Sequence, residues 1–377
     1  MERYPTFGAS EMARRRAALD ALCQEHQLDG ILLYGAAKNG SAVPWLTGWP
    51  VTREAAVLMR PGEQDILWVQ FYNHVPTATE VADGADVRWA GHRTAETLVA
   101  ALEGAGIGRL GLMGPIGWRL HAQLASRASL IDLGGAYARL RMCKSAEEMD
   151  WMRRGAELSD AAMLALRDAA VPGTDERELG AAVEAAYLAM GGTNHIHYLG
   201  ATSMHDPDRC VPAQWPSTRQ LAVGDVLTAE ISAAWWGYAG QVLRSMTIAS
   251  EPTEHYAELQ RVADAAYDAI LGVLRHGATP QEVVDASGVI EDAGFTIYDD
   301  LVHGFGGGYF EPILGSRSRP NGPLTEVVFE AGMTVVVQPN VITPDERTGV
   351  QTGALVAITE DGVEELHRVP RGLWRAG

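Results

Sequence analysis

Apolar and polar residues follow two distinct patterns along the first third of the chain, one typical of helices and one typical of strands. Residues 9–27 carry apolar side chains at helical spacing after Ser10, which predicts a helix. Short apolar runs bounded by glycine or proline predict strands, and these runs lie at residues 30–35, 54–60, 65–70 and 108–114. Helical spacing returns at residues 94–106 and 118–126. This mixture of strands and helices predicts an α/β domain with a central sheet over residues 1–140.

The pattern changes near residue 140, where long amphipathic stretches begin. Residues 139–171 predict a helix with a break before Ser145, whose side chain can cap the next turn. Three more helices are predicted at residues 172–192, 254–277 and 279–294. Strand-like runs lie at residues 226–248, 333–342 and 353–366, and the last contains the hairpin signal Asp361-Gly362. The order of these elements predicts a second domain over residues 141–377 with two similar halves, although no sequence repeat is visible.

Composition narrows the class of protein and of partner. The chain has 377 residues, of which 47% are hydrophobic and 21% charged, as in a globular protein. Its net charge of −18 argues against nucleic acid or an anionic membrane as partner, because both attract a basic face. No apolar run approaches the length of a membrane span, and the first residues lack the apolar centre of a secretory signal. Three widely spaced cysteines fit reduced thiols, so we expect a cytoplasmic protein.

The order of elements resembles the pita-bread family, which includes creatinase, prolidase, aminopeptidase P and methionine aminopeptidase. Six segments carry the resemblance, at residues 141–163, 173–192, 221–248, 303–312, 332–342 and 349–366. The resemblance implies an α+β fold, in which a creatinase/prolidase-type α/β domain precedes a pita-bread domain with pseudo-twofold helices around a curved antiparallel sheet. Residues 44–59 are similar to the segment that reaches the partner's active site in creatinase-like dimers. The resemblance therefore implies a homodimer.

Five positions correspond to the residues that hold two metal ions in most members of this family. The resemblance assigns them to Glu230, Gln241, His303, Gln338 and Gly353, and the first two keep the family's spacing of eleven residues. Two divalent cations need several anionic oxygens, which one carboxylate, one imidazole and two neutral amides cannot supply. We therefore expect no metal ligands and no cofactor, and a chemistry that runs on side chains.

The residues at these positions suggest separate roles. His303 is the expected general acid/base, because an imidazole takes up and returns a proton near neutral pH. Glu230 is expected to support His303 or to hold a cationic substrate group, with a structural ion pair to Arg244 as an equally good interpretation. Gln241 and Gln338 are expected to orient the substrate, and hydrogen bonding to each other is the alternative.

Further candidates come from the histidines of the central segment. His195 and His197 lie two residues apart, so on a strand they would share one face. Creatinase-like sequences have a substrate-binding histidine where this chain has Gln214 and Trp215. Gln214 is therefore a candidate substrate contact, and His195, His197 or His205 can take the place of the missing histidine.

The remaining candidates flank the expected pocket. Glu311 matches a family glutamate, but the histidine that normally precedes it is Phe310, which counts against peptide cleavage. Aromatic residues can cage a cationic or planar substrate, with core packing as the alternative, and the candidates are Trp49, Trp235, Tyr238 and Tyr309. Arg53 is expected to bind a carboxylate group of the substrate in the active site of the neighbouring subunit.

Together these features predict a metal-independent hydrolase that acts on a small polar molecule. Creatinase, a family member that works without metal, cleaves a C–N bond with histidine and glutamate, so the expected bond is of amidino, ureido or amide type. Three alternatives remain open: a lyase or decarboxylase acting on a small carboxylate, a metal-dependent Xaa-Pro peptidase-like enzyme, and a catalytically inactive binding homologue.

Overall fold

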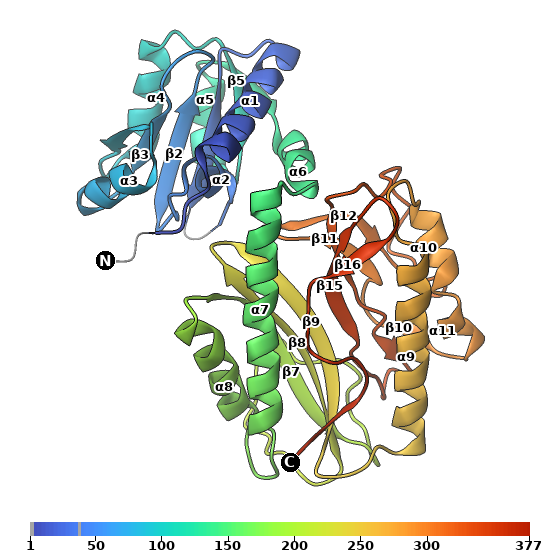
Figure 1. Cartoon of the computed structure of the whole chain (residues 1–377). Helices are drawn as coiled ribbons and strands as arrows, with labels where there is room; N and C mark the ends of the chain where they lie inside the picture. Colours follow the sequence, from blue (N-terminus) through green and yellow to red (C-terminus); the bar gives the residue numbers. More distant parts are fainter. Residues whose placement is uncertain (1–3, 37–38) are drawn as a thin grey trace. The chain divides into compact units, whose positions relative to one another are not determined.

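The computed structural model describes residues 4–36 and 39–377, and the chain divides into two compact units, Met1–Arg141 and Met142–Gly377 (Figure 1). The first unit contains a six-stranded mixed sheet in the order β4-β3-β2-β1-β5-β6. Its strands are β1 (Gly30–Ala36), β2 (Glu54–Met59), β3 (Ile66–Val69), β4 (Asp86–Trp89), β5 (Arg109–Met113) and β6 (Ser129–Asp132). β1 pairs antiparallel with β2 and parallel with β5.

Both faces of this sheet are buried by helices. Ile31 and Leu33 of β1 belong to a core cluster with Leu19 of α1, whereas Leu32 belongs to a second cluster with Leu98 of α4. Alternate residues of β1 therefore enter different cores, as the two-residue period of a strand requires. The helices are α1 (Ala9–His26), α2 (Ala42–Thr47), α3 (Val75–Val81), α4 (Thr94–Gly104), α5 (Trp118–Ala125) and α6 (Gly134–Met142), with a 3₁₀ turn at Tyr72–His74. The predicted helices and strands are confirmed, and the short elements α2, α3, β4 and β6 were not predicted.

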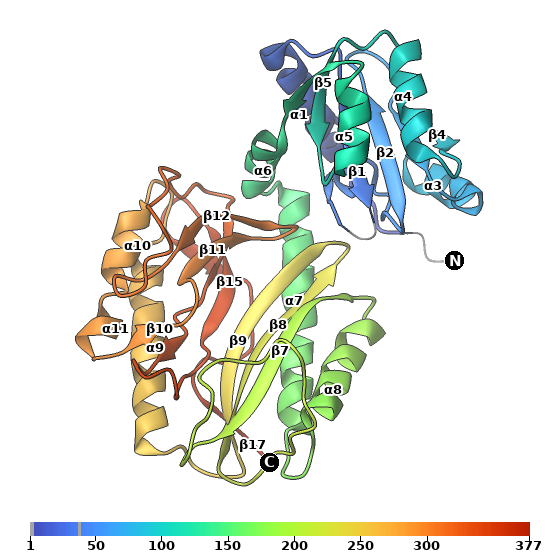
Figure 2. The ribbon, with the colours of Figure 1, turned by 180° about the vertical axis from the view of Figure 1, so that it is seen from behind.

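The second unit is built around a nine-stranded sheet whose main path runs β12-β11-β13-β15-β9-β8-β7. β16 adds to β15, and β17 pairs parallel with β9. The strands β7, β8 and β9 are long and curved (Figure 2). The bounds are β7 (Thr193–Ser203), β8 (Asp225–Trp235), β9 (Tyr238–Ile248), β11 (Val302–Phe305), β12 (Tyr309–Leu314), β13 (Thr334–Val337), β15 (Gly353–Ile358), β16 (Val363–Glu365) and β17 (Trp374–Ala376). Two short strands, β10 (Thr296–Ile297) and β14 (Val341–Ile342), pair separately.

Capping residues set the starts of several helices in this unit. Capping boxes begin α7 (Ala146–Ala169) at Ser145, α8 (Glu176–Ala189) at Asp175 and α10 (Pro280–Ala286) at Thr279. α9 (Glu254–Val273) begins after Thr253. The predicted break before Ser145 is confirmed, since it separates α6 from α7. The single helix predicted at residues 279–294 is wrong, because its hydrogen bonding is interrupted before Val289 and α11 (Val289–Asp292) is separate.

Helices cover one face of the long strands and leave polar residues on the other. α7 and α8 pack against β7–β9 through a core that includes Leu158, Val183, Ile231 and Val242. The predicted hairpin at Asp361-Gly362 joins β15 to β16. An α/β unit followed by helices around an antiparallel sheet confirms the predicted fold class. Within the described residues, no helix combines the length and the apolar character needed to span a membrane.

Candidate active site

Glu230 and Gln241 lie on the face of the sheet that α7 and α8 do not cover. In the antiparallel pair β8–β9, Ile231 faces Val242, and both residues are part of the core beneath α7 and α8. Glu230 and Gln241 are one position away along their strands, so their side chains point to the opposite face. The family spacing therefore brings the two side chains to one place.

A chain of hydrogen bonds links three of the five predicted positions. The Gln241 amide Nε2 donates to Glu230 Oε1 at 2.8 Å and to Gln338 Oε1 at 3.1 Å. Gln338 follows β13, and its Nε2 donates to the backbone oxygen of Asp300 at 3.2 Å. Both amides are 2% exposed, so these bonds satisfy groups that water cannot reach. The two glutamines thus contact each other, as the alternative interpretation anticipated.

His303 lies on β11 in aromatic surroundings. Its ring stacks on Tyr309, with centroids 4.2 Å apart and an interplanar angle of 20°, and meets Phe305 edge-on. Its Nδ1 lies 3.3 Å from the backbone oxygen of Gly304. The residue is 1% exposed, and this burial lowers the pKa of His303 to about 4. The imidazole is therefore neutral at pH 7 and can accept a proton, but burial moves its exchange of protons with solvent from neutral to acidic pH, which differs from the expectation for an ordinary imidazole.

Asp300 is a site residue that the sequence interpretation missed. Tyr309 donates its hydroxyl to Asp300 Oδ1 at 2.9 Å, and Asp300 Oδ2 lies 4.0 Å from His303 Nε2. Burial first, and then the charge of Asp299, raise the pKa of the Asp300 carboxyl to about 8. The pair Asp299-Asp300 directly before the histidine segment was the available signal, but the contact through Tyr309 depends on the pairing of β11 with β12.

Among the described residues, no lysine or arginine forms an ion pair with Glu230. It is 9% exposed, and burial followed by the charge of Asp299 raises the pKa of Glu230 to about 7. Arg244 pairs with Ala229 and so faces the other side of the sheet, where its guanidinium donates to the backbone oxygens of residues 243, 353, 369 and 370. The expected ion pair between Glu230 and Arg244 is therefore wrong.

The five positions do not fit a pair of divalent cations. Glu230 supplies the only carboxylate, and the Gln241 amide hydrogens that contact it are donors. A Cβ atom added at Gly353 would lie 2.7 Å from the Val337 oxygen and 2.9 Å from Leu243 Cδ1, so a glutamate is both missing and hard to place. Among the described residues, no group of three histidine, cysteine or acidic side chains is arranged to hold a metal ion.

The two histidines of β7 do not share a face, contrary to expectation. A bulge between Asn194 and Ile196 places His195 out of register, and its ring contacts Phe305 edge-on at 5.5 Å. His197 pairs with Ile231 and contacts Asn194 on the face that α8 covers. Of these two histidines, His195 is the one near His303, because the rings of His195 and His303 both contact Phe305.

Several aromatic candidates serve the core instead of the polar cluster. Tyr238 donates its hydroxyl to Glu148 of α7 at 2.7 Å, and Trp235 stacks beneath Arg154 of α7, so both lie on the helix-covered face. Trp49 is buried inside the first unit, and its ring packs against His74. Arg53 is exposed. Of the four aromatic candidates, only Tyr309 adjoins His303.

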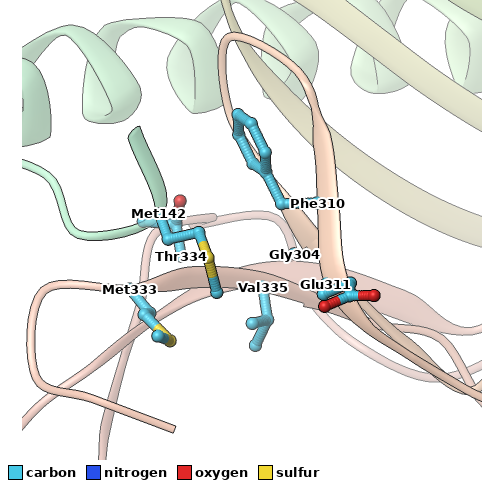
Figure 3. A pocket seen from close by; sticks show the side chains of 7 residues that line it. All are labelled: Met142, Gly304, Phe310, Glu311, Met333, Thr334 and Val335. Carbon is cyan, nitrogen blue, oxygen red and sulfur yellow. The ribbon is translucent and has the colours of Figure 1, made fainter. Parts of the chain in front are cut away.

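Glu311 lies away from His303. With Met142, Gly304, Phe310, Met333, Thr334 and Val335, it lines a small depression in which the Phe310 ring and the Glu311 carboxylate point in different directions (Figure 3). Gly304 pairs with Val335, whereas His303 pairs with Val336 and so faces the other side of the sheet. Glu311 is exposed and accepts a long hydrogen bond from Thr325.

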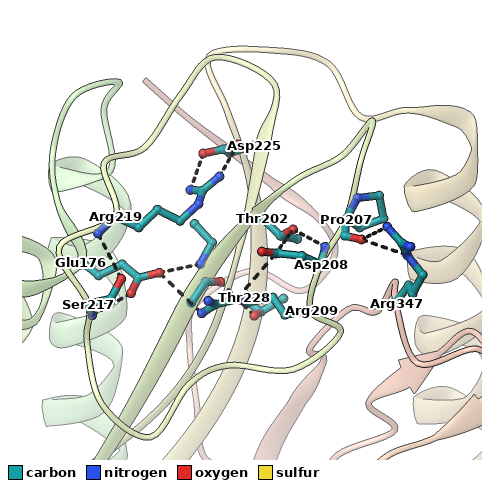
Figure 4. A network of polar contacts seen from close by, with 12 residues as sticks. Glu176, Thr202, Pro207, Asp208, Arg209, Ser217, Arg219, Asp225, Thr228 and Arg347 are labelled. Carbon is teal, nitrogen blue, oxygen red and sulfur yellow. Dashed lines mark hydrogen bonds and ion pairs between the residues drawn. The ribbon is translucent and has the colours of Figure 1, made fainter.

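The connection between β7 and β8 is fastened by a polar network (Figure 4). The buried carboxylate of Glu176 accepts hydrogen bonds from the backbone nitrogens of Ala201 at 3.0 Å and Ser217 at 2.8 Å. Arg219 forms two hydrogen bonds to Asp225, at 2.7 and 2.9 Å. The candidates Gln214 and His205 lie on this connection, and both are exposed.

Two family models match the chain. The Creatinase/Prolidase N-terminal domain model matches residues 15–143, and the Metallopeptidase family M24 model matches residues 150–360. A solved structure of an Xaa-Pro dipeptidase from Bacillus anthracis aligns with a TM-score of 0.81 at 20% identity, covering 97% of this chain and 99% of that chain. At that identity the likeness concerns the fold alone.

Relatives with an activity in their names match the chain over part of their length. The probable dipeptidase PepE of Mycobacterium tuberculosis is 28% identical over 245 residues, which is 62% of this chain and 61% of the relative. The Xaa-Pro dipeptidase of Pyrococcus furiosus is 25% identical over 236 residues, which is 62% and 65% of the two chains. The creatinase of a Bacillus species is 24% identical over 268 residues, which is 64% and 61%. The matched segment thus spans less than two thirds of each relative.

Proposed function

This chain belongs to metallopeptidase family M24, a family of hydrolases, and on that premise we propose that it hydrolyses a C–N bond in a small polar substrate with side chains in place of a metal pair. The hydrogen-bonded chain from Glu230 through Gln241 to Gln338 carries this proposal. Gln241 uses its amide group as donor to both neighbours, so the ligand positions bind one another. Neutral amides that donate to a carboxylate leave it poorly placed to bind a cation.

The pKa values of His303 and Glu230 are shifted in opposite directions, so one residue can act as the base and the other as the acid. His303, with its pKa lowered to about 4, is the base that takes a proton from the attacking water. Glu230, with its pKa raised to about 7, retains a proton near neutral pH and delivers it to the leaving nitrogen. Burial is the main cause of both pKa shifts, and such shifts commonly provide an acid and a base in one active site. Gln241 and Gln338 orient the substrate through their amides.

The substrate class has two candidates. The first is an amidino, ureido or non-peptide amide compound, supported by the missing metal ligands and by Phe310 in place of a family histidine. The second is a metal-dependent cleavage of Xaa-Pro or other dipeptides. The comparisons support that second reaction more directly, because two of the relatives above carry a dipeptidase name and one is named creatinase.

Assembly and location form part of the same proposal. The protein acts as a cytoplasmic homodimer in which Arg53 of one subunit reaches the substrate of its neighbour. The exposed position of Arg53 supports this role, whereas the buried Trp49 is a core residue. Light scattering gives the mass in solution, and Arg53→Ala is expected to raise KM more than it lowers kcat.

The proposal is tested on protein purified without chelator. Its metal content is measured, and hydrolysis is followed by NMR against guanidino, ureido and N-acyl amino acids and Xaa-Pro dipeptides, with and without EDTA. We expect less than stoichiometric metal, activity that survives EDTA, and loss of that activity in His303→Asn. His92→Asn, which changes an exposed histidine of the first unit, is the matched control.

Two results would decide against the side-chain mechanism. Activity that appears only with added Mn, Co or Zn, together with tight uptake of two ions, supports the dipeptidase candidate. Unchanged activity in His303→Asn removes the assigned base. NMR of the products also separates hydrolysis from a lyase or decarboxylase reaction, and no turnover of any compound supports a binding homologue.

A further inference from the structure

A buried carboxyl group lies outside the five family positions and has an unused oxygen. Asp300 is 6% exposed, and Tyr309 donates to its Oδ1 at 2.9 Å. Its Oδ2 is buried, has no hydrogen-bond partner among the described residues, and lies 4.0 Å from His303 Nε2. A buried acceptor without a donor is costly, and such atoms in native structures often mark a functional site.

A second carboxylate adjoins the first at the surface. Asp299 is exposed, and its Oδ1 accepts a hydrogen bond from the Asp300 backbone nitrogen at 2.9 Å. The charge of Asp299 adds to burial in raising the pKa of Glu230 and of Asp300. Among the described residues, neither Glu230 nor Asp300 forms an ion pair with a lysine or arginine. As Asp300 ionises above neutral pH, its charge therefore adds to that of Asp299 without a lysine or arginine counterion among the described residues.

We propose that Asp299 and Asp300 form a subsite for a protonated nitrogen group of the substrate, an ammonium or an amidinium. Such a cation has only hydrogen-bond donors, which matches the unused Asp300 oxygen, and it neutralises a cluster that the protein leaves unpaired. As a statement about the substrate this inference rests on the proposed function, but the subsite itself can be tested without turnover.

The geometry favours an organic cation over a metal ion. The described acidic and histidine side chains do not converge closely enough to bind one metal ion. A nitrogen cation carries its donors on separate N–H bonds, so it can contact carboxylates that do not share a single point. Tyr309 is 52% exposed and its ring stacks on His303 through one face, so the residue also offers an aromatic surface to a cation.

Binding of methylguanidinium tests the subsite, because N-methylurea has nearly the same shape without the charge. Isothermal titration is carried out on the full chain and on Asp299→Asn, Asp300→Asn and the control Asp292→Asn, an exposed residue of α11. We expect saturable binding of methylguanidinium, about tenfold weaker in Asp300→Asn and severalfold weaker in Asp299→Asn, with no change in the control. N-methylurea is expected not to bind.

The pH dependence gives a second readout. Asp300 has a pKa of about 8, so its ionised fraction rises about tenfold between pH 7 and pH 9, and binding of the cation should strengthen by about that factor. The titratable groups around Asp300 are Asp299, Glu230, His303 and Tyr309. His303 stays neutral over this range, and burial raises the pKa of Tyr309 above it.

Equal binding of N-methylurea, or an unchanged dissociation constant in both Asp299→Asn and Asp300→Asn, would overturn the subsite. Asp299 is exposed, so its variant remains informative if the Asp300 variant does not fold. Hydrolysis by His303 without cation binding removes the subsite and keeps the proposed function. Cation binding without any hydrolysis keeps the subsite and removes the proposed function.

Discussion

The substitution Glu230→Gln measures how much the ionisation of a buried carboxyl group lowers the stability of the folded chain. Glu230 is 9% exposed, its Oε1 accepts a hydrogen bond from Gln241, and no lysine or arginine of the residues that the structure describes balances its charge. Glutamine has the same shape, and its carbonyl oxygen can accept the same bond. The variant therefore removes the ionisation of Glu230 with little change in packing, and we expect it to be more stable than the natural chain at alkaline pH.

The sign and size of the effect follow from the raised pKa. The folded chain keeps the Glu230 proton up to about pH 7, whereas an unfolded glutamate releases it near its usual value of 4.5. Stability from this group is therefore complete below pH 4.5 and is lost as pH rises to about 7. At about 1.4 kcal/mol for each tenfold change in acidity, the loss is at most about 3 kcal/mol, and we expect about 1–3 kcal/mol.

Thermal unfolding at pH 5, 6, 7 and 8 measures this difference. Glu230→Gln should match the natural chain at pH 5 and exceed its Tm by roughly 2–10 °C at pH 8, because each kcal/mol shifts Tm by about 2–4 °C for a unit of this size. Glu364→Gln is the control, since Arg153 binds this half-exposed carboxylate at 3.0 Å and holds its pKa low. Its Tm difference should be constant between pH 5 and 8. A constant difference for Glu230→Gln as well would refute the reasoning.

Three further substitutions test packing and hydrogen bonds around the site. Gly353→Ala should destabilise the chain by about 1–3 kcal/mol in denaturant unfolding, because its Cβ would lie 2.7 Å from the Val337 oxygen. The control is Gly272→Ala in α9, whose Cβ would meet no atom within 4 Å, so this variant should be neutral or stabilising by up to about 1 kcal/mol. Arg244→Lys should lower stability by about 2 kcal/mol in the same assay, because an ammonium cannot reproduce the guanidinium bonds to four backbone oxygens. Glu176→Gln replaces an acceptor of backbone N–H groups with a donor, so limited proteolysis should cut the 204–224 connection faster than in the control Glu184→Gln.

Local signals in the sequence were sufficient to predict most elements. Ser145 and Glu148 lie at the spacing of a capping box, and the helix begins between them because each side chain satisfies a backbone group of the other. The apolar runs at residues 30–35 and 54–60 became adjacent strands. A helix cap and an apolar run each depend on residues that are close together in the sequence, so the sequence alone reveals them. The helix expected at residues 279–294 was wrong because its interruption depends on turns near Gly288, where an added Cβ would meet Arg317.

The candidate residues were assigned by their family positions, and of their contacts only the one between Gln241 and Gln338 was anticipated, as an alternative. The resemblance assigned Glu230, Gln241, His303 and Gln338, and the first two keep the family's spacing. Their hydrogen bonds, however, depend on the pairing of strands far apart in sequence. His195 and His197 were expected on one face, and a bulge of one residue separated them. Asp300 was missed because its partner Tyr309 is supplied by the next strand.

Three of the five family positions at this site are coupled through packing and charge. Leu243, which pairs with both Glu230 and Gly353, extends to within 2.9 Å of the position that a Cβ at residue 353 would take. A glutamate restored at 353 would have to displace this side chain. Carboxylates restored at 241 and 338 would add charge beside Glu230, whose ionisation is already disfavoured by burial and by Asp299. A carboxylate placed at one of positions 241, 338 and 353 therefore leaves the other two without an anionic oxygen. The cation that we propose to arrive with the substrate balances the charge of Asp299 and of ionised Asp300, which lie beside this amide-linked cluster.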